Sequence, residues 1–214
     1  MYADYGLTLD GVLALDATGV AKAEGNLAAD YVRDHLADYV GYAPDAYAGA
    51  TAKGLVVSRA QRHGNIVGGV NLLTQLQGLE TPSGRFSDKS EWGDYSNTFS
   101  QSFALIALKK AGVAQSKKSI GFLKLQQCPN GGFREQEADT ACADNTKADA
   151  DATAIAIQGL IATPSNADRS TRISRAAKYL IGLQNSGGGV KGGPGEIPNA
   201  NTTGLAALSL YTAG

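Results

Sequence analysis

The chain has few of the residues on which several kinds of site depend. Its 214 residues include one tryptophan, one methionine, two cysteines and two histidines. The cysteines do not form a CxxC pair, and His35 and His63 lie far from both in the sequence, so no zinc-binding pattern is present. Phosphate-binding loops, GxSxG and HExxH are also missing, as is the GCGEQ segment of thioester proteins. We therefore expect neither a metal ion nor a cofactor.

The distribution of charge and of apolar residues excludes two further classes of protein. The net charge is −1 and no basic run occurs, which excludes a nucleic-acid partner. No apolar run approaches the ~20 residues of a transmembrane helix. The chain opens as MYADYGLTLD, without the charged and apolar segments of a signal peptide. We interpret Met1 as a start codon placed before a mature fragment from which the signal peptide has been left off.

The two cysteines flank one polar connection. Cys128 and Cys142 lie 14 positions apart. Two reduced cysteines are the simpler alternative, but we favour a disulfide, which stabilises a loop of this length by ~3 kcal/mol in the chain-entropy model. A disulfide would place the protein outside the cytosol, in the extracellular space or at the cell surface.

The most regular feature of the sequence is a repeat of about 50 residues. Five apolar, alanine-rich segments recur along the chain, and they begin at Thr8, Thr51, Gln101, Thr153 and Thr203. Helical repeats of this length indicate a solenoid or a closed array of helix pairs.

Amphipathic segments alternate with these apolar ones. The segment ISRAAKYLIGLQ places Ile173, Ala176 and Leu180 at helical spacing, with Arg and Lys on the opposite face. Similar segments begin at Asn26, Val67 and Ser119. An inner ring of helices covered on both sides, wrapped by an outer ring of amphipathic helices, satisfies both patterns. We predict an all-α protein with one domain over residues 1–214, an incomplete α/α toroid (barrel) of about 4.5 helix pairs.

A turn motif follows the amphipathic segments. It consists of a glutamine, a glycine four positions later and a bulky apolar residue two positions after that. Two copies share this spacing, and a third is predicted with three inserted residues. The copies are Gln127, Gly131 and Phe133; Gln184, Gly188 and Val190; and Gln77, Gly84 and Phe86. The glycine supplies the left-handed conformation that ends a helix, and the glutamine can bond to the backbone of the turn.

This motif resembles the QW motif of squalene–hopene and other triterpene cyclases. The helix pair is similar to the repeat of those cyclases and of protein prenyltransferase β-subunits, the terpenoid cyclase and prenyltransferase superfamily. With DYGLT, NTFSQSFALIAL and QQCPNGGF, the chain looks most like secreted actinobacterial proteins that carry prenyltransferase and squalene-oxidase-type repeats and have no established activity. Phe133, Val190 and Phe86 replace the tryptophan of the motif.

The resemblance implies a candidate acid. Class II cyclases carry a DxDDTA motif whose central aspartate protonates the substrate olefin, and this chain has DADATA from Asp149. Asp149 and Asp151 match, but Ala152 replaces the third aspartate. The alternative for Asp151 is a helix N-cap, which we favour because Asn201 occupies the same place in the next repeat, and both residue types are preferred caps. Aromatic residues are few at 7%, although a cyclase needs aromatic rings to stabilise carbocations.

Two functions follow from these observations. The first, which we prefer, is a secreted or cell-surface module that binds an unknown small hydrophobic ligand or a protein partner without catalysis. Its binding residues would be Trp92, Tyr95, Asn97 and Asn201, on the rim where the inner helices begin. In the alternative for Trp92, the ring packs its own loop onto the barrel. The second function is a terpenoid (squalene–hopene-like) cyclase or prenyltransferase-like enzyme that acts on a polyprenyl substrate with Asp151 as general acid.

The pattern leaves one apolar helix without an outer partner. Five inner segments are predicted but only four outer ones, and six pairs would need about 300 residues. We therefore expect that the native protein continues past Gly214, or that a partner or a second copy covers the open end of the ring.

Overall fold

The computed structural model describes residues 3–214 and is helical, as predicted. The expectation for the start of the chain rests on Met1, which lies outside the described residues. The five apolar segments form α1 (Tyr5–Thr18), α4 (Ala48–Ala60), α6 (Thr98–Lys110), α8 (Ala150–Ile161) and α10 (Ala200–Ala213). Two antiparallel pairs of very short strands complete the fold, β1 (Ile66–Val67) with β2 (Val70–Asn71), and β3 (Phe133–Arg134) with β4 (Ala148–Asp149).

The amphipathic segments form the other helices. These are α2 (Lys22–Asp34), α3 (Leu36–Val40), α5 (Leu72–Gly78), α7 (Lys117–Leu125) and α9 (Ala167–Gly182). The segment that begins at Asn26 was predicted as one helix, but it is divided into α2 and α3 at His35. The backbone of His35 leaves the helical region there, with φ −118° and ψ 23°.

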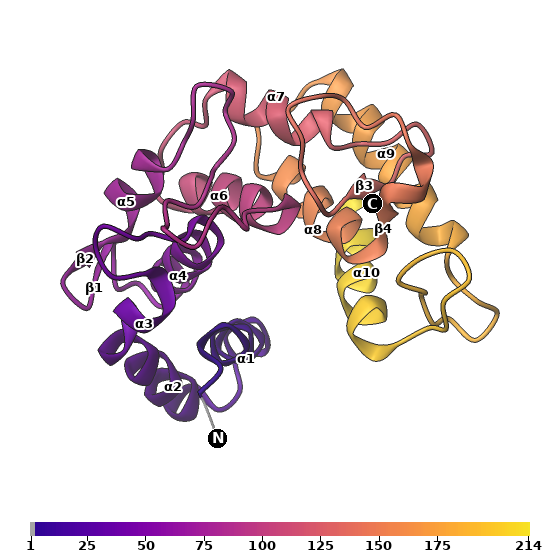
Figure 1. Ribbon diagram of the computed structural model, residues 1–214. Helices are drawn as coiled ribbons and strands as arrows, with labels where there is room; N and C mark the ends of the chain where they lie inside the picture. The colour runs from indigo at the N-terminus through magenta and orange to yellow at the C-terminus, as the bar shows by residue number, and fades with distance from the viewer. Residues whose placement is uncertain (1–2) are drawn as a thin grey trace.

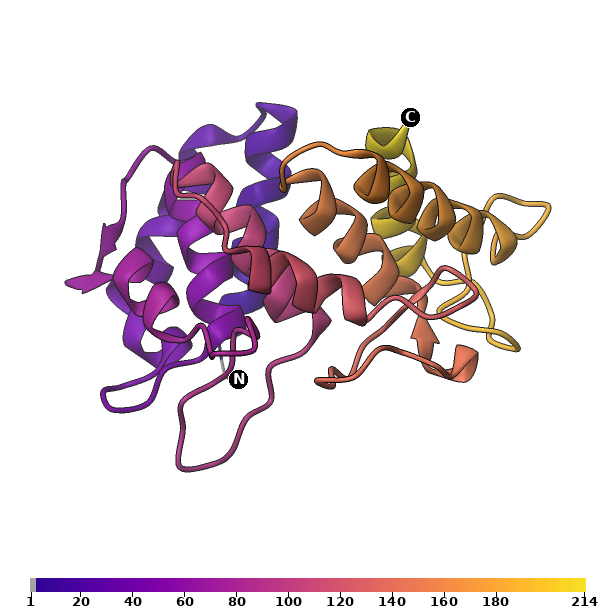
Figure 2. The ribbon, with the colours of Figure 1, turned by 90° about the horizontal axis from the view of Figure 1, so that it is seen from above.

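The apolar helices pack against one another in chain order. α1 contacts α4, α4 contacts α6, α6 contacts α8, and α8 contacts α10. α1 and α4 run parallel, because Lys53 donates to Asp10 midway along both helices and Gln61 donates to Asp16 near their ends. α8 and α10 are also parallel, because Asn201 donates to Asp151 where both begin and Gln158 donates to Thr212 near their ends. Figure 1 shows these helices along an open arc, with the gap between α1 and α10. In Figure 2, seen from above, α7 and α9 lie in front of the apolar helices.

Burial follows the position of each helix in the arc. α4, α6 and α8 are buried over most of their surface. The prediction that every apolar helix is covered on both sides is wrong for α1 and α10, which have a neighbouring apolar helix on one side only. Leu7 in α1 is 68% exposed, and Leu208 and Tyr211 in α10 are 55% and 86% exposed.

The turn motif is present in three copies, but one copy is in a different register from the predicted one. Backbone bridges join Gln127 to Phe133, Gln184 to Val190, and Glu80 to Phe86. The third copy therefore begins at Glu80 without an insertion, and the prediction of Gln77 is wrong. Each copy has its glycine in the left-handed region, with φ 92° at Gly84, 97° at Gly131 and 87° at Gly188.

Candidate functional site at the beginnings of the apolar helices

The beginnings of α6, α8 and α10 are capped by three residues at equivalent positions. Asn97, Asp149 and Asn199 are the N-caps, and each accepts hydrogen bonds from backbone N–H groups in its first turn. Asp149 Oδ1 accepts from the N–H of Ala152 at 2.7 Å. The prediction that Asp151 caps its helix is therefore wrong. The sequence contains a pattern that indicates the correct caps, because Asn97, Asp149 and Asn199 recur at about the same spacing as the apolar helices.

Asp151 instead bridges two neighbouring helices. It lies in the first turn of α8, where its Oδ2 accepts from Asn201 Nδ2 of α10 at 3.1 Å. Its other oxygen, Oδ1, is buried and has no hydrogen-bond partner among the described residues. The structure thus brings together two of the predicted site residues, Asp151 and Asn201, with Asp149 close by.

The carboxyl of Asp149 is half-buried, and burial raises its pKa above the usual value. The hydrogen bond from the N–H of Ala152 lowers the pKa, and the charges of Asp151 and Glu135 raise it again. The net direction is upward, so the folded protein holds a proton on Asp149 more readily than an unfolded chain would.

A groove of about 360 Å³ opens beside Asp149. Charged side chains dominate its lining, namely Arg134, Glu135, Lys147, Asp149 and Glu196, together with the glycines of the loop before α10. An apolar substrate would leave these charges desolvated and unpaired, which is costly. The groove suits a polar or charged ligand better than a hydrocarbon chain.

The other predicted binding residues do not converge on one point. Trp92 and Tyr95 are 70% and 75% exposed on the loop before α6, so the alternative in which Trp92 packs its loop onto the barrel is wrong. The loop is held by its own polar groups, because Asp88 Oδ2 accepts from the N–H of Tyr95 at 3.2 Å. Asn97 is engaged as the cap of α6, with its Oδ1 accepting from the N–H groups of Phe99 and Ser100. A ligand-binding role for these residues stays a prediction.

Cys128 and Cys142 form a disulfide, as predicted. The bridge packs beside Tyr179 and beside Ala148, which lines the groove. Tyr179 Oη donates to the carbonyl of Ala148 at 2.9 Å. The disulfide therefore holds the connection that leads into the Asp149 cap.

A buried carboxyl that was not predicted lies in the same connection. The side chain of Glu137 is fully buried, with Oε2 3.3 Å from Arg85 Nε. Burial raises the pKa of Glu137 to about 8; Arg85 opposes this rise and Asp94 adds to it. Arg85 also lies 3.2 Å from Asp94 and donates to the carbonyl of Ser96. No local pattern distinguishes this glutamate from its exposed neighbours, because its burial depends on contacts with a distant loop.

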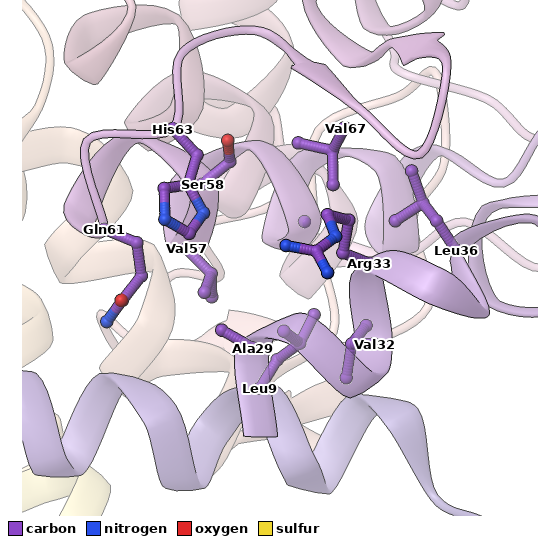
Figure 3. Close-up of a pocket in the computed structure, with 11 residues that line it drawn as sticks. Leu9, Ala29, Val32, Arg33, Leu36, Val57, Ser58, Gln61, His63 and Val67 are labelled. Carbon is purple, nitrogen blue, oxygen red and sulfur yellow. The ribbon is translucent and has the colours of Figure 1, made fainter. Parts of the chain in front are cut away.

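A second cavity lies among α1, α2, α3 and α4 (Figure 3). Its volume is about 30 Å³, enough for about one water molecule. Figure 3 shows Leu9, Ala29 and Val32 on one side and Val57 and His63 on the other. This cavity is a packing void and does not accommodate an organic ligand.

Two kinds of feature are absent from residues 3–214. No helix in this range is long and apolar enough to cross a bilayer. Nor do three or more His, Cys, Asp or Glu side chains in this range gather in a way that could hold a metal ion.

Comparison with known proteins identifies the fold. The apo structure of type II terpene cyclase MstE from Scytonema matches with a TM-score of 0.69 and 14% identity, over 97% of this chain and 63% of that one. A variant of MstE in complex with geranylgeranyl dihydroxybenzoate, its substrate, matches with a TM-score of 0.71 and 14% identity, over 99% and 63%. The fold is terpene cyclase-like.

A protein from Actinoplanes also matches, with a TM-score of 0.65 and 16% identity, over 95% of this chain and 63% of that one. The chain thus spans about 63% of the length of these proteins. No family model and no curated protein matches the sequence. At such low identity, the likeness concerns the fold alone.

Proposed function

We propose that this chain is a non-catalytic binding module with a terpene cyclase-like fold. The observation that carries the proposal is the role of the two aspartates that match the cyclase motif. Asp149 is used as a helix cap, and Asp151 accepts a hydrogen bond from Asn201. Both groups act as hydrogen-bond acceptors that hold helices in place, so each has a structural role in this arrangement.

The polar groove beside Asp149 supports the same reading. Protonating an alkene requires a carboxylic acid facing an apolar chamber, where the substrate is folded and water is excluded. Here Arg134, Lys147 and Glu196 occupy that side of Asp149. The groove fits a polar ligand, and the exposed Trp92 and Tyr95, on a separate loop, are suitable anchors for a protein partner.

We also infer the finer features of the architecture. The arc is an incomplete α/α toroid of about 4.5 helix pairs within one domain. The disulfide supports export from the cytosol to the cell surface or the extracellular space. The open end of the arc supports association with a partner or with a second copy.

A terpenoid cyclase is the second candidate function. Two observations favour it: Asp151 Oδ1 is buried without a hydrogen-bond partner, and the similar protein MstE binds a geranylgeranyl substrate. In this case Asp151 would be the general acid and Asp149 its neighbour.

The two candidates are separated by assaying the purified chain with squalene and with geranylgeranyl dihydroxybenzoate. We expect no cyclised product by mass spectrometry, and no difference between the parent chain and Asp151→Asn. Product formed by the parent chain and lost in Asp151→Asn would overturn the proposal in favour of the cyclase.

A further inference from the structure

Two of the three turn motifs hold the next amphipathic helix in the same way. In the first turn, a Cβ built on Gly84 would lie 2.3 Å from the carbonyl carbon of Lys118 in α7. In the second, a Cβ built on Gly131 would lie 2.5 Å from the carbonyl oxygen of Arg175 in α9. The glycine is needed in both places because the backbone of the following helix rests directly on it.

The side chain above each glycine also makes an equivalent bond. Lys118 Nζ donates to the carbonyl of Pro82 at 2.9 Å, and Arg175 Nη2 donates to the carbonyl of Pro129 at 2.8 Å. Both carbonyls belong to the residue two positions before the glycine. A basic side chain on the incoming helix is therefore a repeated part of this contact.

The third turn is built like the second. Gln184 Nε2 donates to the carbonyl of Gly188 at 2.9 Å, as Gln127 does to Gly131 at 3.0 Å. The N–H of Val190 donates to Thr203 Oγ1, as that of Phe133 does to Thr153 Oγ1.

The space next to the third turn is open. Around a Cβ built on Gly188, the nearest atom is Gln184 Nε2 at 3.9 Å. Gln127 Nε2 makes a second bond, to the carbonyl of Arg172 in α9, whereas Gln184 has no counterpart of this bond within residues 3–214. The carbonyl of Ser186 occupies the position of Pro82 and Pro129.

A groove of mixed polarity lies on the same open edge. It has a volume of about 430 Å³ and lies between α9 and the end of α10. Its apolar lining includes Ile161, Ile173, Ile181 and Leu210, and its polar lining consists of Arg169, Ser170, Ser174 and Thr212. Ile181 is 56% exposed, unlike Ile173 and Leu180 on the buried face of the same helix. An amphipathic helix seated on the third turn would run along this groove.

We propose that the turn of residues 184–190 and this groove form a docking site for an amphipathic helix of a partner protein. The partner helix carries an apolar stripe and a Lys or Arg that donates to the carbonyl of Ser186, as Lys118 and Arg175 do in the two filled turns. The proposal rests on the binding function proposed above and specifies the chemistry of the partner.

The test uses the whole chain and a peptide with the sequence of residues 166–183, which contains α9 and has blocked ends. Fluorescence anisotropy of the labelled peptide measures binding. We expect saturable binding that falls at least tenfold with the chain variant Gly188→Ala, because the new Cβ occupies the place of the helix backbone. Gly187→Ala is the matched control, since Ser83 and Asn130 show that this position of the turn tolerates a side chain.

The peptide supplies an independent comparison if Gly188→Ala fails to fold. Arg175→Ala in the peptide should weaken binding about tenfold, as expected for loss of a hydrogen bond from a charged group. Lys178→Ala removes the same charge from the exposed face and should leave binding unchanged. Absence of saturable binding, or equal binding to the folded Gly188→Ala chain, would overturn the docking site.

Sedimentation velocity of the chain alone identifies the occupant. We expect a monomer. A dimer that is lost in Gly188→Ala would show that a second copy fills the site, and would overturn the assignment to a separate partner. Failure of the docking site would leave the assay for cyclised products unchanged, so the two proposals can fail separately.

Discussion

Replacing the glycine of a turn with alanine should have very different effects at Gly131 and at Gly188. The two glycines share nearly the same left-handed conformation, with φ 97° and 87°. An alanine in this conformation costs about 1 kcal/mol at either site. At Gly131 the new Cβ also lies 2.5 Å from the carbonyl oxygen and 2.9 Å from the carbonyl carbon of Arg175, so α9 must move outward.

The cost of that movement follows from the contacts that α9 makes. Overpacking of a tight contact costs about 1–3 kcal/mol. The bonds from Arg175 to Pro129 and from Gln127 to Arg172 would weaken, at about 1 kcal/mol in total. We therefore expect Gly131→Ala to lose about 3–5 kcal/mol, and Gly188→Ala only about 1 kcal/mol.

Urea denaturation followed by circular dichroism measures these free energies of unfolding. For a chain of this size, 1 kcal/mol corresponds to a change in Tm of about 2–4 °C, so thermal unfolding should separate the variants by several degrees. Gly84→Ala should behave like Gly131→Ala, since its Cβ would lie 2.3 Å from the backbone of α7. Equal losses at Gly131 and Gly188 would refute the reasoning, because they would show that the contact with the next helix contributes nothing.

Three further predictions concern the connection that leads into α8. Replacing both Cys128 and Cys142 with serine should lower the free energy of unfolding by about 3 kcal/mol, and reduction of the parent chain by dithiothreitol should give the same shift in a urea titration. Glu137→Gln should make the protein more stable than the parent at high pH but not at low pH. In the folded protein, burial raises the pKa of Glu137 from 4.5 to about 8. The contribution of the protonated side chain to the free energy of unfolding is therefore fully present below pH 4.5 and is lost as the pH rises through 8. The advantage of the variant should therefore grow between pH 5 and 9, by up to about 5 kcal/mol at 1.4 kcal/mol per pKa unit, and an advantage that shrinks with pH would contradict this. Asp149→Ala should cost about 1 kcal/mol by loss of the cap, whereas Asp149→Asn should keep most of the stability in the same assay, since Asn97 and Asn199 cap the neighbouring helices.

The helices could be predicted from the sequence because local periodicity determines them. Apolar spacing such as that of Ile173, Ala176 and Leu180 is a property of one segment, and it recurs in the structure as the buried face of α9. The exposure of α10 follows instead from the count of segments, which leaves this helix without an outer partner at the open end of the ring. Its composition resembles that of α8, so composition alone does not predict that Leu208 is 55% exposed; burial depends on which helices lie next to it.

The site residues were harder to predict, because their roles depend on the residue at which each turn and each helix begins. The third turn was predicted to begin at Gln77 because a glutamine begins the other two copies. The bridge from Glu80 to Phe86 shows that it begins at Glu80, which keeps the spacing of the other copies. Assigning the cap to Asp151 placed the start of α8 two residues too late; β4 ends at Asp149, and the helix begins directly after it. Glu137 is buried because its own loop packs against the distant loop that carries Arg85. The residues next to Glu137 in the sequence do not indicate this burial.

The stacking of the apolar helices in chain order has a consequence for how the protein comes apart. The central helix pairs make more contacts with the pairs before and after them than within themselves, so stability is distributed as in a one-dimensional array. The end units hold one interface instead of two. Amide hydrogens of α1, which buries only Leu9 and Val12, should exchange with solvent well before those of α6 and α8. For the same reason, a whole helix pair could be inserted or removed during evolution while the remaining interfaces stay intact.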